Sequence, residues 1–180
     1  MLKRFLLLIG LFAGSTLTNA QAAPTASRVG DLQIGIGYGL ANSDYAPERF
    51  KGIAAYAGFD FTPHFGVEAD FRLLNDPSPA ALYEKTYEIG GRYHRTYGRI
   101  SPYAKLMAGR GVFNYQYNVA NLAYNMIAGG GGVDYRAMRF LSVRADFEYQ
   151  RWFGFPPNGL TPMVGSIGVA YHFGTSREGR

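Results

Sequence analysis

The chain has 180 residues, of which 47% are apolar, 16% aromatic and only 17% charged, with 18 Lys and Arg against 13 Asp and Glu and no Cys. Soluble domains usually carry about 25% charged residues, so this composition is short of charge. The aromatic content excludes a disordered chain, and the missing cysteines exclude a disulfide scaffold or a thiolate metal site. Past the first dozen residues, no apolar run approaches the ~18–20 residues of a spanning helix.

Residues 1–22 have the three-part form of a secretory signal peptide. Two basic residues precede the apolar stretch Phe5–Ala13, and small residues follow up to the cleavage signal Ala20-Gln21-Ala22. We expect cleavage after Ala22, or one residue later after Ala23. The mature chain then keeps 16 basic and 13 acidic residues. This small, evenly spread excess does not indicate binding to nucleic acid.

Apolar and polar residues alternate with a period of two along most of the remaining chain, which is typical of half-buried strands. In the segment 65–73, one face is Phe, Val, Ala, Phe and Leu, and the other is wholly polar or glycine. The register through Gly129–Gly132 stays open, because glycine inside a strand often marks a bulge. Eight strands are predicted, in the order 32–41, 50–61, 65–73, 83–97, 103–115, 122–135, 141–150 and 166–173.

The connections between these strands alternate between short and longer. Short links at 62–64, 97–102 and 136–139 are followed by longer, polar ones at 42–49, 75–82, 116–121 and 154–161. This layout is typical of outer-membrane barrels. The sequence therefore predicts an all-β, eight-stranded antiparallel up-and-down transmembrane β-barrel over residues 23–173, with both termini in the periplasm.

The polar faces mix small residues with charges of both signs, which suits the inside of a narrow closed barrel. We therefore expect the apolar faces to meet lipid and the polar faces to fill a packed, hydrated lumen. The predicted lumen network is Glu68, Asp70, Arg72, Glu84, Glu88, Arg92, Lys105, Arg144, Asp146 and Glu148. Aromatic residues near strand ends are expected to form interfacial girdles, namely Tyr38, Tyr83, Phe113, Tyr115, Tyr149 and Phe173.

One register of the third and fourth strands gives a pairing of these charges. It places Arg72 opposite Glu84 and Glu68 beside Glu88, so that a cation from elsewhere in the lumen must lie between the two glutamates. A shift of two residues would preserve which face each side chain takes. The candidate cations are Arg92, Lys105 and Arg144.

The last predicted strand resembles the C-terminal signature of outer-membrane barrels, because its alternating apolar residues end in aromatic-x-Phe. The residues that carry this signature are Ile167, Val169, Tyr171 and Phe173. The resemblance implies recognition by the barrel-assembly machinery during insertion. The segment Gly30–Phe173 is similar to the small eight-stranded barrels of the OmpA transmembrane-domain, OmpX and opacity-protein type. That similarity implies a monomer in the bacterial outer membrane, in contact with the lipid bilayer and lipopolysaccharide. The polar tail 174–180 departs from it, since such barrels often end on the aromatic residue.

No catalytic, cofactor or metal site is expected. Similar barrels that deacylate lipid A use a His, a Ser and a carboxylate on the lipid-facing side. Here Ser142 and Ser166 lie in phase with the polar residues that are predicted to point into the lumen, and we call this position the lumen phase. The histidines His64, His94 and His172 also take the lumen phase near the periplasmic strand ends, but their spacing is scattered rather than motif-like. We therefore predict a protein that is not an enzyme.

An aromatic cluster lies at the base of the last long loop, with Trp152, Phe153 and Phe155. Interfacial anchoring is the favoured interpretation, and a contact site for a partner or surface glycan is the alternative. The expected role is structural or surface-interacting, in the manner of an adhesin, through loops whose ligand is unknown. Two alternatives stay open, namely a narrow low-conductance pore and a soluble lipocalin-like barrel that binds small hydrophobic ligands.

Overall fold

A computed structural model describes residues 30–45, 49–76, 82–115, 117, 119–156 and 158–173. The predicted signal peptide and the polar tail lie outside these residues. Within the described ranges, no helix has the length and apolar character to cross a membrane. The strands are β1 (Asp31–Asn42), β2 (Phe50–Asp60), β3 (Phe65–Asn75), β4 (Tyr83–His94), β5 (Ile100–Asn114), β6 (Asn121–Met138), β7 (Leu141–Phe153) and β8 (Met163–His172).

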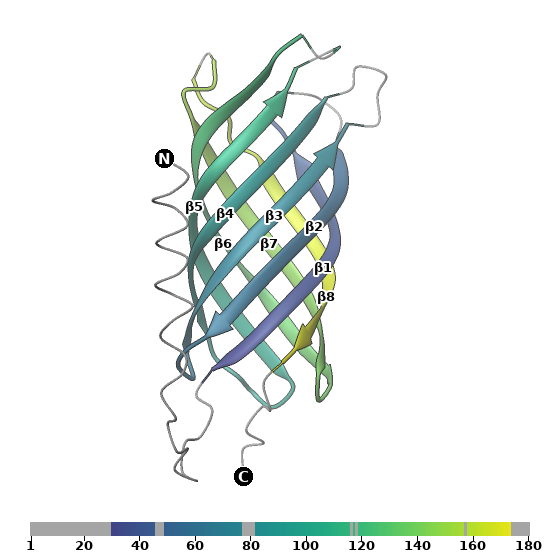
Figure 1. Cartoon of the computed structure of the whole chain (residues 1–180), viewed down its shortest axis with the longest axis vertical. Coiled ribbons are helices and arrows are strands. Elements are labelled where there is room, and N and C mark those ends of the chain that lie inside the picture. The colour runs from purple at the N-terminus through teal and green to yellow at the C-terminus, as the bar shows by residue number, and fades with distance from the viewer. Residues whose placement is uncertain are drawn as a thin grey trace, which may run out of the picture.

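The eight strands form one closed antiparallel barrel in which each strand pairs with its neighbours in sequence. β8 closes the barrel on β1, with Val169 opposite Ile36. Figure 1 shows that the start of β1 and the end of β8 lie at the same end, together with the short links between strands. We call this the turn end and the opposite one the loop end. The predicted fold class is confirmed.

The predicted register of the third and fourth strands is wrong by two residues. Arg72 lies opposite Thr86 rather than Glu84, and Asp70 lies opposite Glu88. Alternation alone could not choose between the two registers, because a shift of two leaves every side chain on its face. The observed register places Gly90, and not Glu88, opposite Glu68.

Strand β6 is regular through the glycine run that the sequence left open. Gly129–Gly132 pairs residue by residue with β5 and β7, and the one irregularity of the β6–β7 pairing falls between Arg136 and Met138. The inward glycines make room for large neighbours. A Cβ on Gly132 would lie 2.7 Å from the Tyr103 hydroxyl, and one on Gly111 would overlap the Trp152 ring.

The apolar strand faces point outward, as predicted. Leu106 is 71% exposed and Ile89 66% exposed, which suits contact with lipid and not a soluble surface. The lipocalin-like alternative, which needs these faces inside, is therefore wrong. The girdle prediction is also wrong for Phe113, which is fully buried inside the barrel.

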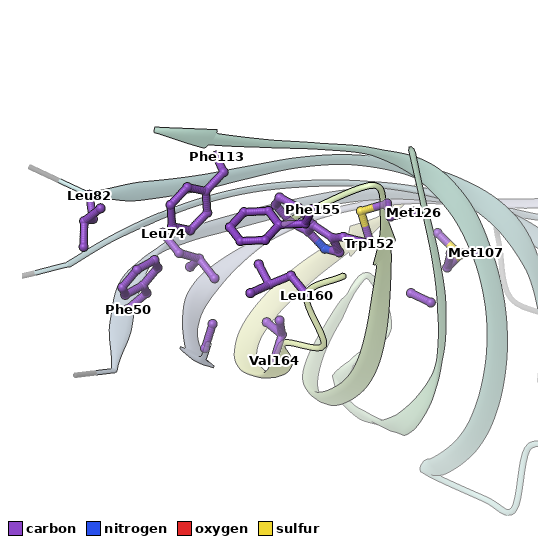
Figure 2. Close-up of a cluster of buried hydrophobic side chains, with 12 residues drawn as sticks. Phe50, Leu74, Leu82, Met107, Phe113, Met126, Trp152, Phe155, Leu160 and Val164 are labelled. Carbon is purple, nitrogen blue, oxygen red and sulfur yellow. The ribbon is translucent and has the colours of Figure 1, made fainter. Parts of the chain in front are cut away.

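The lumen has two layers of opposite character. Ion-paired side chains occupy the turn-end part. We call them the charge network, and its members are Asp60, Glu68, Asp70, Arg72, Glu88, Arg92, Lys105, Asp134, Arg144, Asp146 and Glu148. The loop-end part holds the apolar plug shown in Figure 2. Its members are Ala41, Phe50, Leu74, Leu82, Met107, Phe113, Met126, Ala128, Trp152, Phe155, Leu160 and Val164.

Candidate functional site: the filled lumen and the outer face

The charge network is centred on Arg72 of β3. Its guanidinium lies 2.6 Å from a carboxylate oxygen of Glu88 and of Glu148, 3.0 Å from Asp70 and 3.4 Å from Asp146. A buried cation is stable only when it is paired and hydrogen-bonded. These contacts therefore hold β3, β4 and β7 together across the inside of the barrel.

Lys105 of β5 shares most of these partners. Its Nζ lies 2.7 Å from Asp70 and from Glu148, 3.1 Å from Asp146 and 3.2 Å from Glu68. Three carboxylates thus stand between two cations, and each charge has neighbours of opposite sign. This alternation offsets the cost of burying charges away from water.

Two further arginines extend the network toward the turn end. Arg144 lies 2.7 Å from both Asp134 and Glu68. Arg92 lies 3.1 Å from both Asp134 and Asp60. Among the described residues, four cations therefore contact seven carboxylates, so that removing one cation leaves its acidic partners short of positive charge.

Two tyrosines and close packing complete this layer. The Tyr103 hydroxyl donates a hydrogen bond of 2.5 Å to Asp146, and the Arg144 guanidinium carbon lies 3.9 Å from the centre of the Tyr56 ring. A cavity of about 10 Å³ lies beside Arg72, and one water needs about 10–15 Å³. The side chains at this level therefore leave little free space inside the barrel.

The apolar plug closes the loop-end half. Phe155 and Leu160 belong to the β7–β8 connection, which turns back into the barrel, and both are buried. The Phe155 ring meets the Phe113 ring edge to face at 5.1 Å between centroids, and Tyr45 meets Phe113 at 4.8 Å. Such aromatic pairs add to the stabilisation from burial. The plug therefore includes part of a loop as well as the strands.

Gln150 joins the two layers. Its amide oxygen accepts a hydrogen bond of 3.0 Å from Trp152 Nε1, and its amide nitrogen donates to Glu88 and Glu148 at 3.2 and 3.3 Å. Trp152 is fully buried, so the prediction that it anchors the barrel at the interface is wrong. The alternation along β7 contains the signal for this, because Trp152 shares the lumen phase of Gln150 and Glu148.

The structure brings nine of the ten predicted lumen residues together. The exception is Glu84, which is buried nearer the loop end beside Ser43 and forms no ion pair with another described residue. The prediction for His64 is also wrong, because this residue lies exposed in the β2–β3 turn. The predicted lumen network omitted five residues that contact its members. They are Tyr56, Asp60, Tyr103, Asp134 and Gln150.

The outer face of the strands carries charge of only one sign. Within the described strands, every outward charged side chain is basic and lies in the half of its strand nearest the loop end. These residues are Lys51, Lys85, Arg110 and Arg151. No group of three or more His, Asp or Glu in the described ranges is arranged to hold a metal ion.

Residues 6–173 match the family model described as outer membrane protein beta-barrel domain. The chain belongs to this family. An outer-membrane barrel explains why the apolar faces point outward and the charges inward. Membership places the chain in the bacterial outer membrane. No curated protein matches the sequence.

Solved structures share the fold of this outer-membrane barrel. Ail, the attachment invasion locus protein of Yersinia pestis, is 17% identical, with a TM-score of 0.59 over 80% of this chain and 99% of that one. Neisserial surface protein A is 13% identical, with a TM-score of 0.62 over 79% of this chain and 96% of that one. OprG from Pseudomonas aeruginosa is 16% identical, with a TM-score of 0.60 over 81% of this chain and 96% of that one. At these identities, the likeness concerns the fold alone.

Proposed function

We propose that the chain acts in the outer membrane as a closed barrel that works through its exposed surface, in a structural or adhesin-like role. One observation carries this proposal, namely that the charge network and the apolar plug fill the lumen in consecutive layers. A filled lumen leaves the loops and the outer face as the surfaces open to a partner. That one barrel of this fold carries attachment and invasion in its name supports the adhesin-like role.

We also propose that the loop end faces the outside and both termini face the periplasm, with lipopolysaccharide as the lipid partner. Lys51, Lys85, Arg110 and Arg151 lie at the height where phosphate groups of that lipid would meet the barrel. One exposed ion pair contributes little, about 0.2–1 kcal/mol, but these four cations act together, and no acidic side chain points outward from the described strands. Such a partner needs no opening into the lumen and leaves the barrel a monomer.

The last strand supports a proposed contact with the barrel-assembly machinery. Ile167, Val169, Tyr171 and Phe173 are all about half exposed on the outer face. They form one apolar row beside the seam between β8 and β1, and the Phe173 amide donates to Leu32 at 2.8 Å. Before β1 and β8 pair, this row and the free backbone edge of β8 are both available to another protein.

Fractionation, heat-dependent gel mobility and surface labelling test location and orientation together. We expect the protein in the outer-membrane fraction, with a faster band before boiling than after. A cysteine placed at Asn158 should react with a membrane-impermeant maleimide on intact cells, and a cysteine placed at Thr62 should react only after lysis. Labelling of Thr62→Cys on intact cells would overturn the orientation.

Planar-bilayer recording and cell attachment separate the surface role from the narrow pore. We expect no stable conductance from the wild-type barrel, and weaker attachment of cells to host surface glycans or matrix proteins when the gene is deleted. Steady ion conductance with unchanged attachment would favour the pore.

The lipid contact is tested by replacing two outward cations. Lys51→Gln with Lys85→Gln should lose most of the gain in unfolding temperature that lipopolysaccharide gives over neutral phospholipid. The matched control, Arg95→Gln with Arg99→Gln at the turn end, should keep that gain. Equal losses in the two double variants would contradict the proposed contact.

A further inference from the structure

A chain of three hydrogen-bonded side chains crosses the closing seam of the barrel at the turn end. Ser142 of β7 places its Oγ 2.9 Å from Nε2 of His172 in β8. Nδ1 of the same imidazole lies 2.7 Å from a carboxylate oxygen of Asp31 in β1. The charge network does not use the Ser142 or His172 side chain, so these contacts form a separate feature.

An ionised Asp31 can only accept a hydrogen bond, which selects the neutral imidazole tautomer with its proton on Nδ1. With its proton on Nδ1, His172 donates to Asp31, and its free Nε2 accepts the hydroxyl proton of Ser142. A nucleophile, a base within hydrogen-bond reach and a third group that orients the base are the arrangement that activates a serine. Ser142 and His172 are buried, and Asp31 is partly exposed, which suits a carboxylate that orients the base at the edge of the lumen.

A cavity and a cation lie next to this chain. All three residues line a cavity of about 40 Å³, which exceeds the ~10–15 Å³ that one water needs. Arg136 lines the same cavity and stands opposite Ser142 in the β6–β7 pairing. Its guanidinium has no ion-pair partner within the described part of the chain, and a positive charge beside the serine would stabilise an oxyanion formed there.

We propose that Ser142 is an activated nucleophile at the turn-end mouth and accepts short acyl groups from small esters. Its Oγ bonds to the acyl carbon while the hydroxyl proton passes to His172 Nε2. The ester C–O bond then breaks, and the leaving alkoxide takes that proton. Water hydrolyses the acyl-serine to the free acid and restores Ser142. Asp31 is the positioning residue of the base.

The location determines the substrate class. The expectation of no catalysis rested on lipid substrates, which meet the outer face, whereas this serine points into the lumen. A cavity of this size admits an acetyl group and excludes a long acyl chain. The proposed activity is therefore directed at small esters that enter from the turn end, and it is independent of the surface role of the loops.

Covalent labelling and ester hydrolysis test the proposal on the refolded full barrel. Methanesulfonyl fluoride, a small serine reagent, should modify Ser142, as located by peptide mass spectrometry. Hydrolysis of p-nitrophenyl acetate should fall at least about 100-fold in Ser142→Ala, and p-nitrophenyl decanoate should not be hydrolysed by the wild type. The matched control, Ser166→Ala, removes another lumen-phase serine and should keep both the label and the rate. Heat-dependent gel mobility establishes that each variant is folded.

The positioning role of Asp31 has its own readout. Asp31→Asn should lower the rate and change its pH profile, and Asp31→Glu should restore part of the rate, which a purely structural contact would not do. An unmodified Ser142 in folded protein, or equal ester hydrolysis by the wild type and Ser142→Ala, would overturn the proposal. Such a result would leave the three side chains as a structural tie between β7, β8 and β1.

Discussion

Replacing Arg72 with Met tests whether the charge network stabilises the barrel. Arg72 contacts four carboxylates, and three of them, Asp70, Asp146 and Glu148, also contact Lys105. These three keep a cation after the substitution. Glu88 does not, because Arg72 is its only ion-pair partner among the described residues.

The cost therefore amounts to about one buried carboxylate left without a cation. Breaking a buried pair by removing one partner costs about 3–5 kcal/mol, so Arg72→Met should lower the free energy of unfolding by that amount. If Glu88 carries the penalty, adding Glu88→Gln removes it. The double variant should therefore recover about 2 kcal/mol or more of the loss, since replacing a buried pair by neutral groups is often close to neutral.

Urea denaturation of the protein refolded in lipid vesicles measures both values. Trp152 is the only tryptophan and is buried in the lumen, so its fluorescence reports on the inside of the barrel. Lys51→Met, which removes an outward cation, is the matched control and should change stability by less than about 1 kcal/mol. A loss below about 1 kcal/mol for Arg72→Met, or no recovery in the double variant, would refute the reasoning.

Three other substitutions address the plug, the isolated acid and the last strand. Glu84→Gln should raise the unfolding free energy in urea by about 1 kcal/mol, because it removes a buried carboxylate that has no ion-pair partner among the described residues; a loss would contradict this. Gly111→Ala should shift Trp152 fluorescence to the red and cost about 1–3 kcal/mol, because the new methyl group meets the indole ring, whereas Gly91→Ala, with open space around it, should change neither. Phe173→Ser should lower the amount of heat-modifiable barrel in cells while leaving refolding in vesicles unchanged, and equal losses in both assays would indicate a folding defect instead.

The sequence predicts the closed barrel well because alternation reports directly on which face a residue takes. Over residues 65–73 of β3 and 141–150 of β7, the polar positions are the ones that meet in the lumen, and the apolar ones meet lipid. Strand pairing is less accessible, because registers that differ by two residues satisfy the same alternation. The alternation therefore could not predict the register in which Asp70 lies opposite Glu88, although the network needs both acids beside Arg72.

The plug was missed for a different reason. Aromatic residues near strand ends are common at membrane interfaces, which favours an interfacial position for Trp152 and Phe113. The alternation along their strands places both side chains in the lumen instead. Phe155 and Leu160 lie in a connection, where no alternation exists to say whether a side chain turns inward. The Ser142–His172–Asp31 contacts join three strands, and only a correct closing register brings them together.

The charge network also bears on how the barrel is completed. Arg72 and Glu148 are separated by 76 residues in the chain, so β3 must wait for β7 before its arginine is fully paired. A sheet that inserted without its last strands would leave the lumen cations near hydrocarbon, where each costs about 2–4 kcal/mol at the bilayer midplane. Incomplete barrels are thereby disfavoured relative to closed ones. We therefore expect the buried charges to couple insertion of the barrel to its closure.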